Sequence, residues 1–194
     1  MKLTRADLYS LEEYAQKRSE FRSKVMAHKK NRIVHVGVHA CLYFEDRLTM
    51  QYQIQEMLRV ERIFEPDAIE EELAAYNPLI PDGSNWKATF MLQFDDPSQR
   101  RQQLAKLIGI ENQVWVKING CEPVLGIADE DLERTNEEKT SSVHFLRFEL
   151  TAEMVDAAKR GAPIEVGIDH DHYRYRLDSI PTSVRDSLVC DLEE

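Results

Sequence analysis

The tetrapeptide Asp169-His170-Asp171-His172 is the densest group of potential metal ligands in the sequence. In extended backbone alternate residues point to the same face, so His170 and His172 would present both imidazoles together. Carboxylates beside an imidazole can bind a metal or orient the ring through its second nitrogen. The tetrapeptide therefore predicts a site for zinc or iron. The alternative is an ordinary solvent-exposed turn of the same composition.

A second segment repeats this spacing. His39 and Cys41 lie two residues apart in an apolar run, and His35 falls on the same face of the run. If this run and the His170 segment are neighbours, imidazole, thiolate and carboxylate ligands would converge, as they do around zinc or iron. The sequence does not determine whether the two segments are adjacent. The candidate metal ligands are therefore His170, His172, His39, Cys41, Asp169 and Asp171.

A polar helix offers the other candidate site. Asp46 is a good N-cap, and the residues from Arg47 to about Ile63 contain no Gly or Pro, so we expect a helix there. Its apolar stripe would contain Met50 and Ile54, with Tyr52 on the opposite side. Polar side chains interrupt or border this stripe, so the helix needs polar partners when buried. The residues in question are Arg47, Gln51, Glu56 and Glu61.

Two interpretations of these helix residues stay open. In the first, the charged side chains form ion pairs with neighbouring elements or extend to solvent. In the second, they line a polar pocket in which Glu56 or Glu61 provides acid-base catalysis and an Arg binds an anion. A carboxylate-bridged metal pair is disfavoured, because no Glu has a His three residues later. Phosphate-binding loops and dinucleotide fingerprints are absent, so we expect no nucleotide cofactor.

Composition and charge exclude several classes of protein. The 194 residues carry a formal net charge of −10, so an extended nucleic-acid-binding surface is not expected. Three widely spaced cysteines without a C-x-x-C pair argue against a disulfide framework and favour the reducing cytoplasm. The sequence has no apolar run long enough to span a bilayer, so we expect no membrane association.

The charge is distributed unevenly along the chain. Residues 1–32 contain nine Lys or Arg and four Asp or Glu, whereas residues 129–138 contain six acids and one Arg and are expected to form an exposed loop. Cations at the end of a helix offset its dipole, and a site for phosphate or an acidic partner is the alternative explanation. The densest basic cluster consists of Arg22, Lys24, Lys29, Lys30 and Arg32.

The pattern of elements predicts an α+β fold in which a helical N-terminal third packs on a mostly antiparallel or mixed sheet. We expect one domain over residues 1–194, with a helical segment at 1–32 and an α+β core at 33–194. Asn119-Gly120 is the strongest hairpin signal. Up to seven strands are expected, at residues 33–44, 87–94, 114–118, 121–127, 142–150, 164–168 and 173–177. About six helices are expected, at residues 10–30, 47–63, 67–76, 97–108, 151–160 and from about 182.

Four segments together resemble a bacterial family catalogued as domain of unknown function 3501, and the resemblance spans essentially the whole chain. The segments are Leu3–Leu8, Met26–Arg32, Tyr43–Arg59 and Gly161–His170. Members of that family are commonly encoded beside a rubrerythrin-like protein and a large iron-sulfur oxidoreductase. The resemblance therefore implies an accessory role in iron or peroxide metabolism, with one of these two proteins as the partner. It assigns no role to individual residues.

We therefore expect one of three functions, each typical of a different class of protein. The first is a cytoplasmic, metal-associated accessory protein of a redox or oxidative-stress system. The second is a metal-free interaction subunit that binds an oxidoreductase through its basic N-terminal helix or its acidic loop. The third is a small-molecule enzyme with a polar pocket lined by the helix over residues 47–63.

Overall fold

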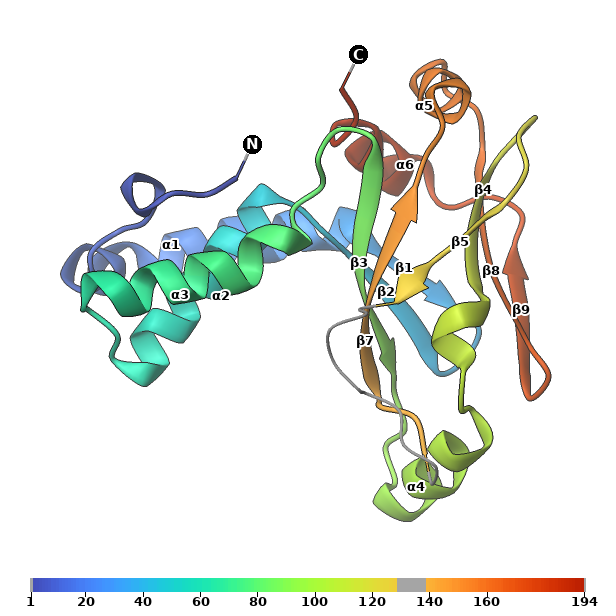
Figure 1. Cartoon of the computed structure of the whole chain (residues 1–194), viewed down its shortest axis with the longest axis horizontal. Coiled ribbons are helices and arrows are strands. Elements are labelled where there is room, and N and C mark those ends of the chain that lie inside the picture. The colour runs from blue at the N-terminus through green and yellow to red at the C-terminus, as the bar shows by residue number, and fades with distance from the viewer. Residues whose placement is uncertain (1, 129–138, 194) are drawn as a thin grey trace.

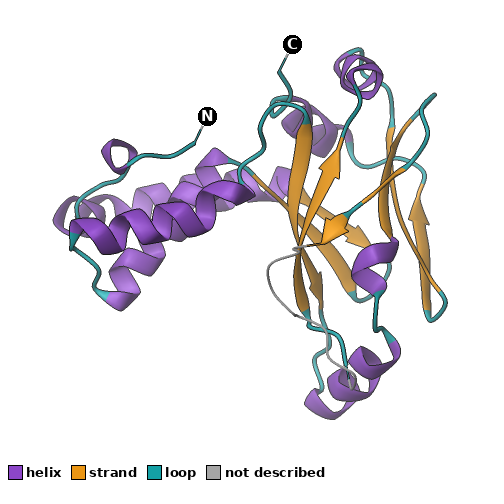
Figure 2. Ribbon diagram, viewed as in Figure 1, coloured by secondary structure: helices purple, strands orange, loops and turns teal. Residues whose placement is uncertain are grey.

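Two antiparallel sheets lie face to face, and an arm of three helices projects from one end of them (Figure 1). The computed structural model describes residues 2–128 and 139–193. The first sheet has the strand order β1-β2-β3-β7-β6 and the second has the order β5-β4-β8-β9. The expected α+β class is confirmed, with two antiparallel sheets in place of the single sheet that the sequence suggested (Figure 2).

The elements have the following bounds. The α-helices are α1 (Leu11–Lys29), α2 (Arg47–Glu61), α3 (Pro66–Tyr76), α4 (Pro97–Lys106), α5 (Ala152–Lys159) and α6 (Thr182–Val189). The strands are β1 (Ile33–Val36), β2 (Ala40–Glu45), β3 (Asn85–Leu92), β4 (Val114–Ile118), β5 (Val124–Leu125), β6 (Ile127–Ala128), β7 (Val143–Glu149), β8 (Ile164–His170) and β9 (Tyr173–Leu177). Among the described residues, none of the helices is long and apolar enough to cross a membrane.

The arm is built from residues on both sides of the β1–β2 hairpin. Ser10 caps α1 by accepting a hydrogen bond from the Glu13 backbone, and Asp46 caps α2 in the same way, as their sequence positions predicted. The arm does not lie flat on a sheet, which differs from the packing expected for the helical third (Figure 1). It buries two small apolar clusters of its own, one between α1 and α2 and one between α2, α3 and the N-terminal segment.

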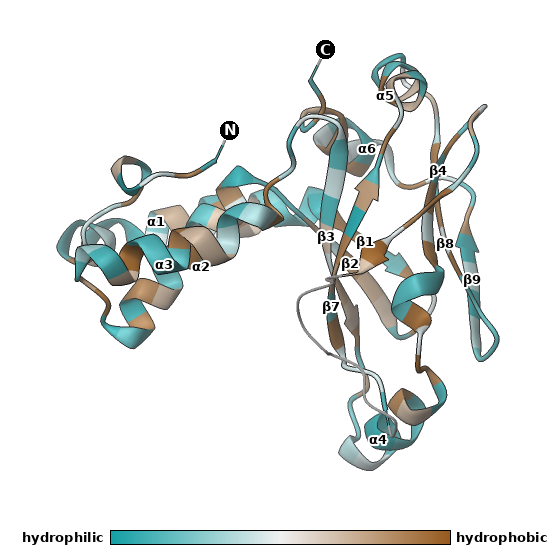
Figure 3. Cartoon of the chain, in the orientation of Figure 1, coloured by the Kyte–Doolittle hydropathy of each residue, from teal (hydrophilic) through white to brown (hydrophobic). Residues whose placement is uncertain are grey.

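The main core fills the space between the two sheets. Alternate residues of β3, such as Trp86, Ala88 and Phe90, are fully or almost fully buried and face the second sheet. On the second sheet Val116 and Val166 are paired and completely buried. This alternation shows in the hydropathy colouring of the strands (Figure 3) and matches the period-two patterns in the sequence. The sheets and this core thus form the base from which the arm extends.

The residues expected to form one strand over 33–44 form a hairpin instead. Gly37 has φ +77°, and the chain reverses through Gly37, Val38 and His39, so that Val36 pairs with Ala40. Because the loop has three residues, each even-numbered residue of β1 pairs with an even-numbered residue of β2. The side chains that face the core therefore have even numbers on both strands. The pattern therefore continues through the loop as though the strand were unbroken.

The second difference concerns the Asp- and His-rich tetrapeptide. β8 was expected to end at Ile168, but it continues to His170, and Asp169 pairs with Arg174 on β9. Only Asp171 and His172 form the turn. The Asn119-Gly120 hairpin is confirmed, with β4 and β5 antiparallel, and the chain then passes to the first sheet through β6.

Candidate functional site

The β8–β9 turn brings the two expected histidine ligands together. The ring centroids of His170 and His172 are 5.9 Å apart. Both nitrogens of His170 have partners, because Nδ1 accepts from the His172 backbone N–H at 3.2 Å and Nε2 lies 3.2 Å from the Ile108 carbonyl oxygen. The Asp169 carboxylate accepts from the Trp115 indole at 2.8 Å, and Asp171 is almost fully exposed. The Asp169 carboxylate is therefore directed to the Trp115 indole and not to the imidazoles.

The hairpin that carries His39 and Cys41 does lie beside β9. The Tyr173 hydroxyl accepts from the backbone N–H groups of His39 and Ala40, both at 2.9 Å. The His39 ring stacks on Phe94, with centroids 4.4 Å apart. Cys41 is buried on the face of its sheet opposite Leu42, which points into the main core. Burial raises the pKa of the Cys41 thiol to about 11, so this thiol is protonated near neutral pH.

The six expected metal ligands are therefore distributed over four places. His170, Asp171 and His172 lie at the β8–β9 turn, Asp169 lies on β8 against Trp115, His39 lies in the hairpin loop, and Cys41 lies on the outer side of β2. Within residues 2–128 and 139–193, no group of three or more His, Cys, Asp or Glu side chains is arranged to hold a metal ion. The acidic segment at 129–138, which was expected to be an exposed loop, lies outside the described residues.

The polar residues of α2 mostly hold the arm together. Arg47 forms an ion pair with Asp7 at 2.5 Å, and the Gln51 amide donates to the Asp7 carbonyl at 2.6 Å. Gln55 is completely buried and exchanges two hydrogen bonds with the Tyr9 backbone. These contacts fix the N-terminal segment along α2. They bear out the inference that α2 needs polar partners, because a buried amide without them would be costly.

Glu56 is the centre of a polar network between α1 and α2. It accepts from the Tyr14 hydroxyl at 2.7 Å and from two Arg18 nitrogens at 2.7 and 2.9 Å, and Arg59 lies on its other side. The Arg18 guanidinium is the main cause that lowers the pKa of the Glu56 carboxyl to about 2. An anionic group with this low pKa is a poor general base near neutral pH. Glu61 is exposed at the end of α2.

A buried arginine joins the arm to the sheets. The Arg32 side chain is only 2% exposed. It donates to the Phe44 and Glu45 carbonyls at 3.0 and 3.1 Å, to Ser187 at 3.2 Å, and to the Asp191 carboxylate at 2.5 Å. These donors all end on protein acceptors, so Arg32 acts as a clamp between the base of the arm and α6. The sequence had suggested a cation near a helix end or part of a site for phosphate or an acidic partner. It did not indicate Asp191, which is 159 positions away.

Two carboxylates share this guanidinium. Asp46 lies 3.5 Å from Arg32 Nε and 2.5 Å from His28 Nε2. Burial acts against ionisation of Asp46, but the Arg32 charge and the Thr49 backbone N–H hold its pKa below the ordinary value. Burial raises the pKa of Asp191 to about 6, although Arg32 opposes the shift. Both carboxylates border a cavity of about 350 Å³ that Arg47 and Cys190 also line. Perturbed carboxyl groups beside a cavity can mark functional sites as well as structural ion pairs.

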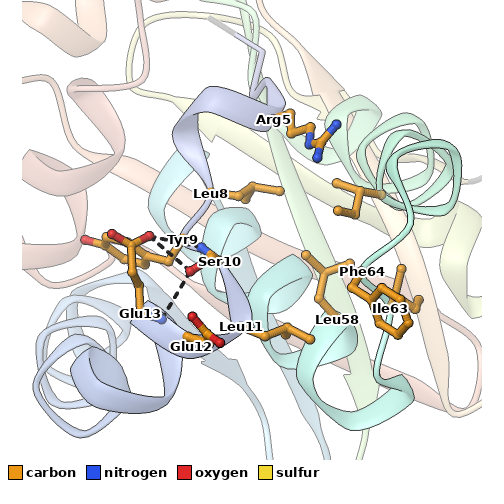
Figure 4. Close-up of a pocket in the computed structure, with 11 residues that line it drawn as sticks. Arg5, Leu8, Tyr9, Ser10, Leu11, Glu12, Glu13, Leu58, Ile63 and Phe64 are labelled. Atoms are coloured by element: carbon orange, nitrogen blue, oxygen red, sulfur yellow. Dashed lines mark hydrogen bonds between the residues drawn. The ribbon is translucent and has the colours of Figure 1, made fainter.

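The end of the arm carries an apolar cleft. Figure 4 shows the residues that line it, which come from the N-terminal segment, the start of α1, the end of α2, the loop that follows and the start of α3. The volume of the cleft is about 580 Å³. Phe64, one of the residues that line it, is 67% exposed. Apolar side chains form most of the walls, with Arg5, Glu12 and Glu13 as polar neighbours. The apolar lining consists of Leu8, Leu11, Leu58, Ile63, Phe64 and Ile69.

Sequence patterns did not indicate this cleft. Its walls are three segments that come together only after α1 and α2 pair, and single exposed apolar residues such as Phe64 are common in any sequence. The αL conformation of Arg62, with φ +56°, ends α2 and turns Ile63 and Phe64 across the end of the arm. A non-glycine residue in that conformation is uncommon, and the sequence alone did not reveal it.

Comparisons with known proteins identify the family of this chain. The model of a family described as "Protein of unknown function (DUF3501)" matches residues 2–192. A crystal structure at 1.90 Å resolution of a "novel protein of unknown function" from Burkholderia pseudomallei K96243 superposes with a TM-score of 0.94. The two chains are 50% identical and each is covered completely. A search of curated proteins found no match. This chain belongs to the DUF3501 family.

Proposed function

We propose that this protein is a cytoplasmic accessory protein that binds another protein through the end of its helical arm. One observation carries the proposal. The arm extends away from the sheets and ends in an apolar cleft, beside which Phe64 is two-thirds exposed (Figures 1 and 4). Folding of the chain leaves this surface uncovered, and apolar surface gathered around a cleft is typical of protein contact sites.

The composition of the cleft indicates the kind of segment it would accept. Aliphatic walls suit one or two large apolar side chains, and buried apolar anchors provide much of the energy of protein interfaces. Arg5 and Glu12 at the cleft offer polar contacts around such an anchor. A partner would therefore present an amphipathic segment with an exposed Leu, Phe or Met.

The family resemblance gives the class of partner to test first. A rubrerythrin-like protein or an iron-sulfur oxidoreductase encoded nearby would place this protein in a redox or oxidative-stress system. An accessory role needs no metal or catalytic group of its own, and the arm-end cleft provides a contact surface without either.

The test is binding to a rubrerythrin-like protein and to an iron-sulfur oxidoreductase, the two classes of partner that the resemblance implies. The native chain, a Phe64→Asp variant and a Leu125→Asp control would be compared by surface plasmon resonance. Leu125 is 58% exposed but lies on β5, away from the arm. We expect Phe64→Asp to weaken binding at least about tenfold, because a charge in an apolar contact remains desolvated, and the control to bind normally. Equal binding of all three proteins would refute the proposal.

Metal association remains a second candidate, and one observation favours it. The His170 and His172 rings are neighbours on an exposed turn, so two imidazoles could bind zinc or iron if His170 gave up one present hydrogen bond. Elemental mass spectrometry of untagged protein purified without chelator, with a His170→Ala/His172→Ala variant beside it, provides the test. About one equivalent of metal that the folded variant loses would support this role. Equal metal content in the two proteins would exclude these ligands.

A further inference from the structure

The arm has one open face, which lies opposite the N-terminal segment. That segment covers the side of α2 that carries Gln51 and Gln55. At 100° per residue, Gln53, Met57 and Val60 project from the opposite side of α2, roughly 120–180° around its axis. α1 and α3 flank α2 on its two sides. The open face is therefore a layer of three helices with α2 in the middle, and Val60, which is 63% exposed, lies on it near the C-terminal end of α2.

One edge of the open face is basic. Arg18 on α1 reaches Glu56 on α2, and Arg22 follows it by one helical turn on the same flank. Lys29 lies further along this flank, where its Nζ is 5.9 Å from the centre of the Tyr52 ring. Among the described residues, neither Arg22 nor Lys29 forms an ion pair with a carboxylate. Two cations thus remain available along the α1 edge.

The opposite edge of the open face is acidic. α3 contains four acidic residues and no Lys or Arg. Burial raises the pKa of Glu72, and the neighbouring carboxylates of Glu61 and Glu71 raise it further. Among the described residues, no ion pair compensates the α3 acids. The α3 edge would therefore gain from a nearby cation.

We propose that two copies of this chain pair through their open faces, around a two-fold axis parallel to α2. Rotation about that axis places the basic α1 edge of one copy over the acidic α3 edge of the other, and it does so twice. The two α2 helices meet in the middle through Met57 and Val60. An interface of this kind is isologous, so each edge contact occurs in both directions. None of the residues assigned to this pairing lines the arm-end cleft, so the pairing and the proposed partner binding use different residues.

The face is large enough for a weak to moderate dimer. At 1.5 Å rise per residue and 8–10 Å between neighbouring axes, the three helices cover roughly 20 by 30 Å, or about 600 Å² in each copy. The total of about 1,200 Å² is at the lower end of the range for specific interfaces. Because the outer contacts are ionic, association should weaken as salt is added.

Light scattering and sedimentation equilibrium test the stoichiometry. Each chain has a mass of 22.6 kDa, and we expect a concentration-dependent species of twice that mass at low salt. Dissociation should increase with salt concentration. For a dimer with a Kd of about 1 μM, nearly all of the protein should be dimeric at about 100 μM. A protein that is still monomeric at that concentration and at low salt would overturn the proposal.

A charge exchange distinguishes this pairing from other dimers. An Arg22→Glu/Lys29→Glu variant has two acidic edges. A Glu61→Arg/Glu71→Arg/Glu72→Arg variant keeps only Asp67 and Glu70 as acids on the α3 edge and therefore has two basic edges. Each should be monomeric alone because like charges face each other, and an equimolar mixture should form a heterodimer. Circular dichroism would check that both fold. Failure of folded variants to pair in the mixture, or dimers of either variant alone, would contradict the proposed geometry.

Disulfide trapping gives a second readout that does not depend on the charged residues. Val60 should lie close to its own copy across the two-fold axis, so Val60→Cys in a Cys121→Ser/Cys190→Ser background should form an intermolecular disulfide on mild oxidation. Leu125→Cys in the same background is the control, because Leu125 is similarly exposed on β5. Equal trapping of both variants would indicate random collision and would count against the dimer.

Discussion

Replacement of Arg32 by Met should destabilise the protein strongly. The substitution keeps much of the side-chain volume but removes the donors to two buried carbonyls, to Ser187 and to the Asp191 carboxylate. The loss of one partner of a buried ion pair typically costs about 3–5 kcal/mol, because the other charge stays buried and unpaired. Urea unfolding followed by circular dichroism measures this free energy. We expect a loss within that range.

The same variant should show a defined pH dependence. Burial already raises the pKa of Asp191 to about 6, while Arg32 acts to lower it. Without Arg32, the pKa values of Asp191 and Asp46 should both rise, so the folded variant binds protons more tightly than the folded native protein does. The stability difference should therefore grow as the pH rises through about 6 and shrink on acidification, for example between about pH 8 and about pH 5.

A matched control separates this effect from the general loss of an arginine. The Arg174 side chain is 70% exposed and lies 3.8 Å from an exposed Asp171, so Arg174→Met should change the free energy of unfolding by less than about 0.5 kcal/mol. A loss below about 1 kcal/mol for Arg32→Met, or a loss that is the same at both pH values, would refute the clamp.

Three further substitutions test other parts of the fold. Tyr173→Phe should cost about 2–3 kcal/mol in urea unfolding, since it leaves the backbone N–H groups of His39 and Ala40 without their acceptor. Gly167→Ala should lower stability by at least about 2 kcal/mol and alter tryptophan fluorescence, because the added Cβ would lie 2.2 Å from Trp115. Glu56→Gln should cost about 1 kcal/mol near neutral pH, and this difference should fade as the pH falls from about 4.5 towards 2. Unchanged stability would contradict the first two predictions, and a difference that persists in acid would contradict the third.

Local signals predicted most of the secondary structure. The cap at Ser10, the cap at Asp46 and the Asn119-Gly120 turn each depend on residues within a few positions, and each formed where it was expected. The polar residues of α2 also indicated correctly that this helix needs polar partners, which proved to be Asp7 and Tyr9.

Features set by distant contacts could not be predicted in this way. Tyr52 was expected opposite the buried stripe of α2, but α1 covers that side and leaves Tyr52 only 9% exposed. The hairpin loop at Gly37 is held by Tyr173, which lies more than 130 positions away. The strand pattern contains no sign of this contact, because a three-residue loop preserves the alternation.

The same limit applies to the candidate sites. The His170 and His172 spacing correctly indicated two neighbouring rings, while the Asp169 carboxylate instead bonds to the Trp115 indole on β4. The clamp at Arg32 and the arm-end cleft both combine segments that are far apart in the sequence. Neither has a local motif, so both required the three-dimensional structure.

Hydrogen–deuterium exchange with the candidate partner would test most directly whether the arm end is the binding surface. Amides in residues 5–13 and 58–69 should exchange more slowly in the complex, because these segments form the cleft. Strands β4, β8 and β9 should be unaffected. Protection confined to those strands, with the arm end unchanged, would contradict the proposed function.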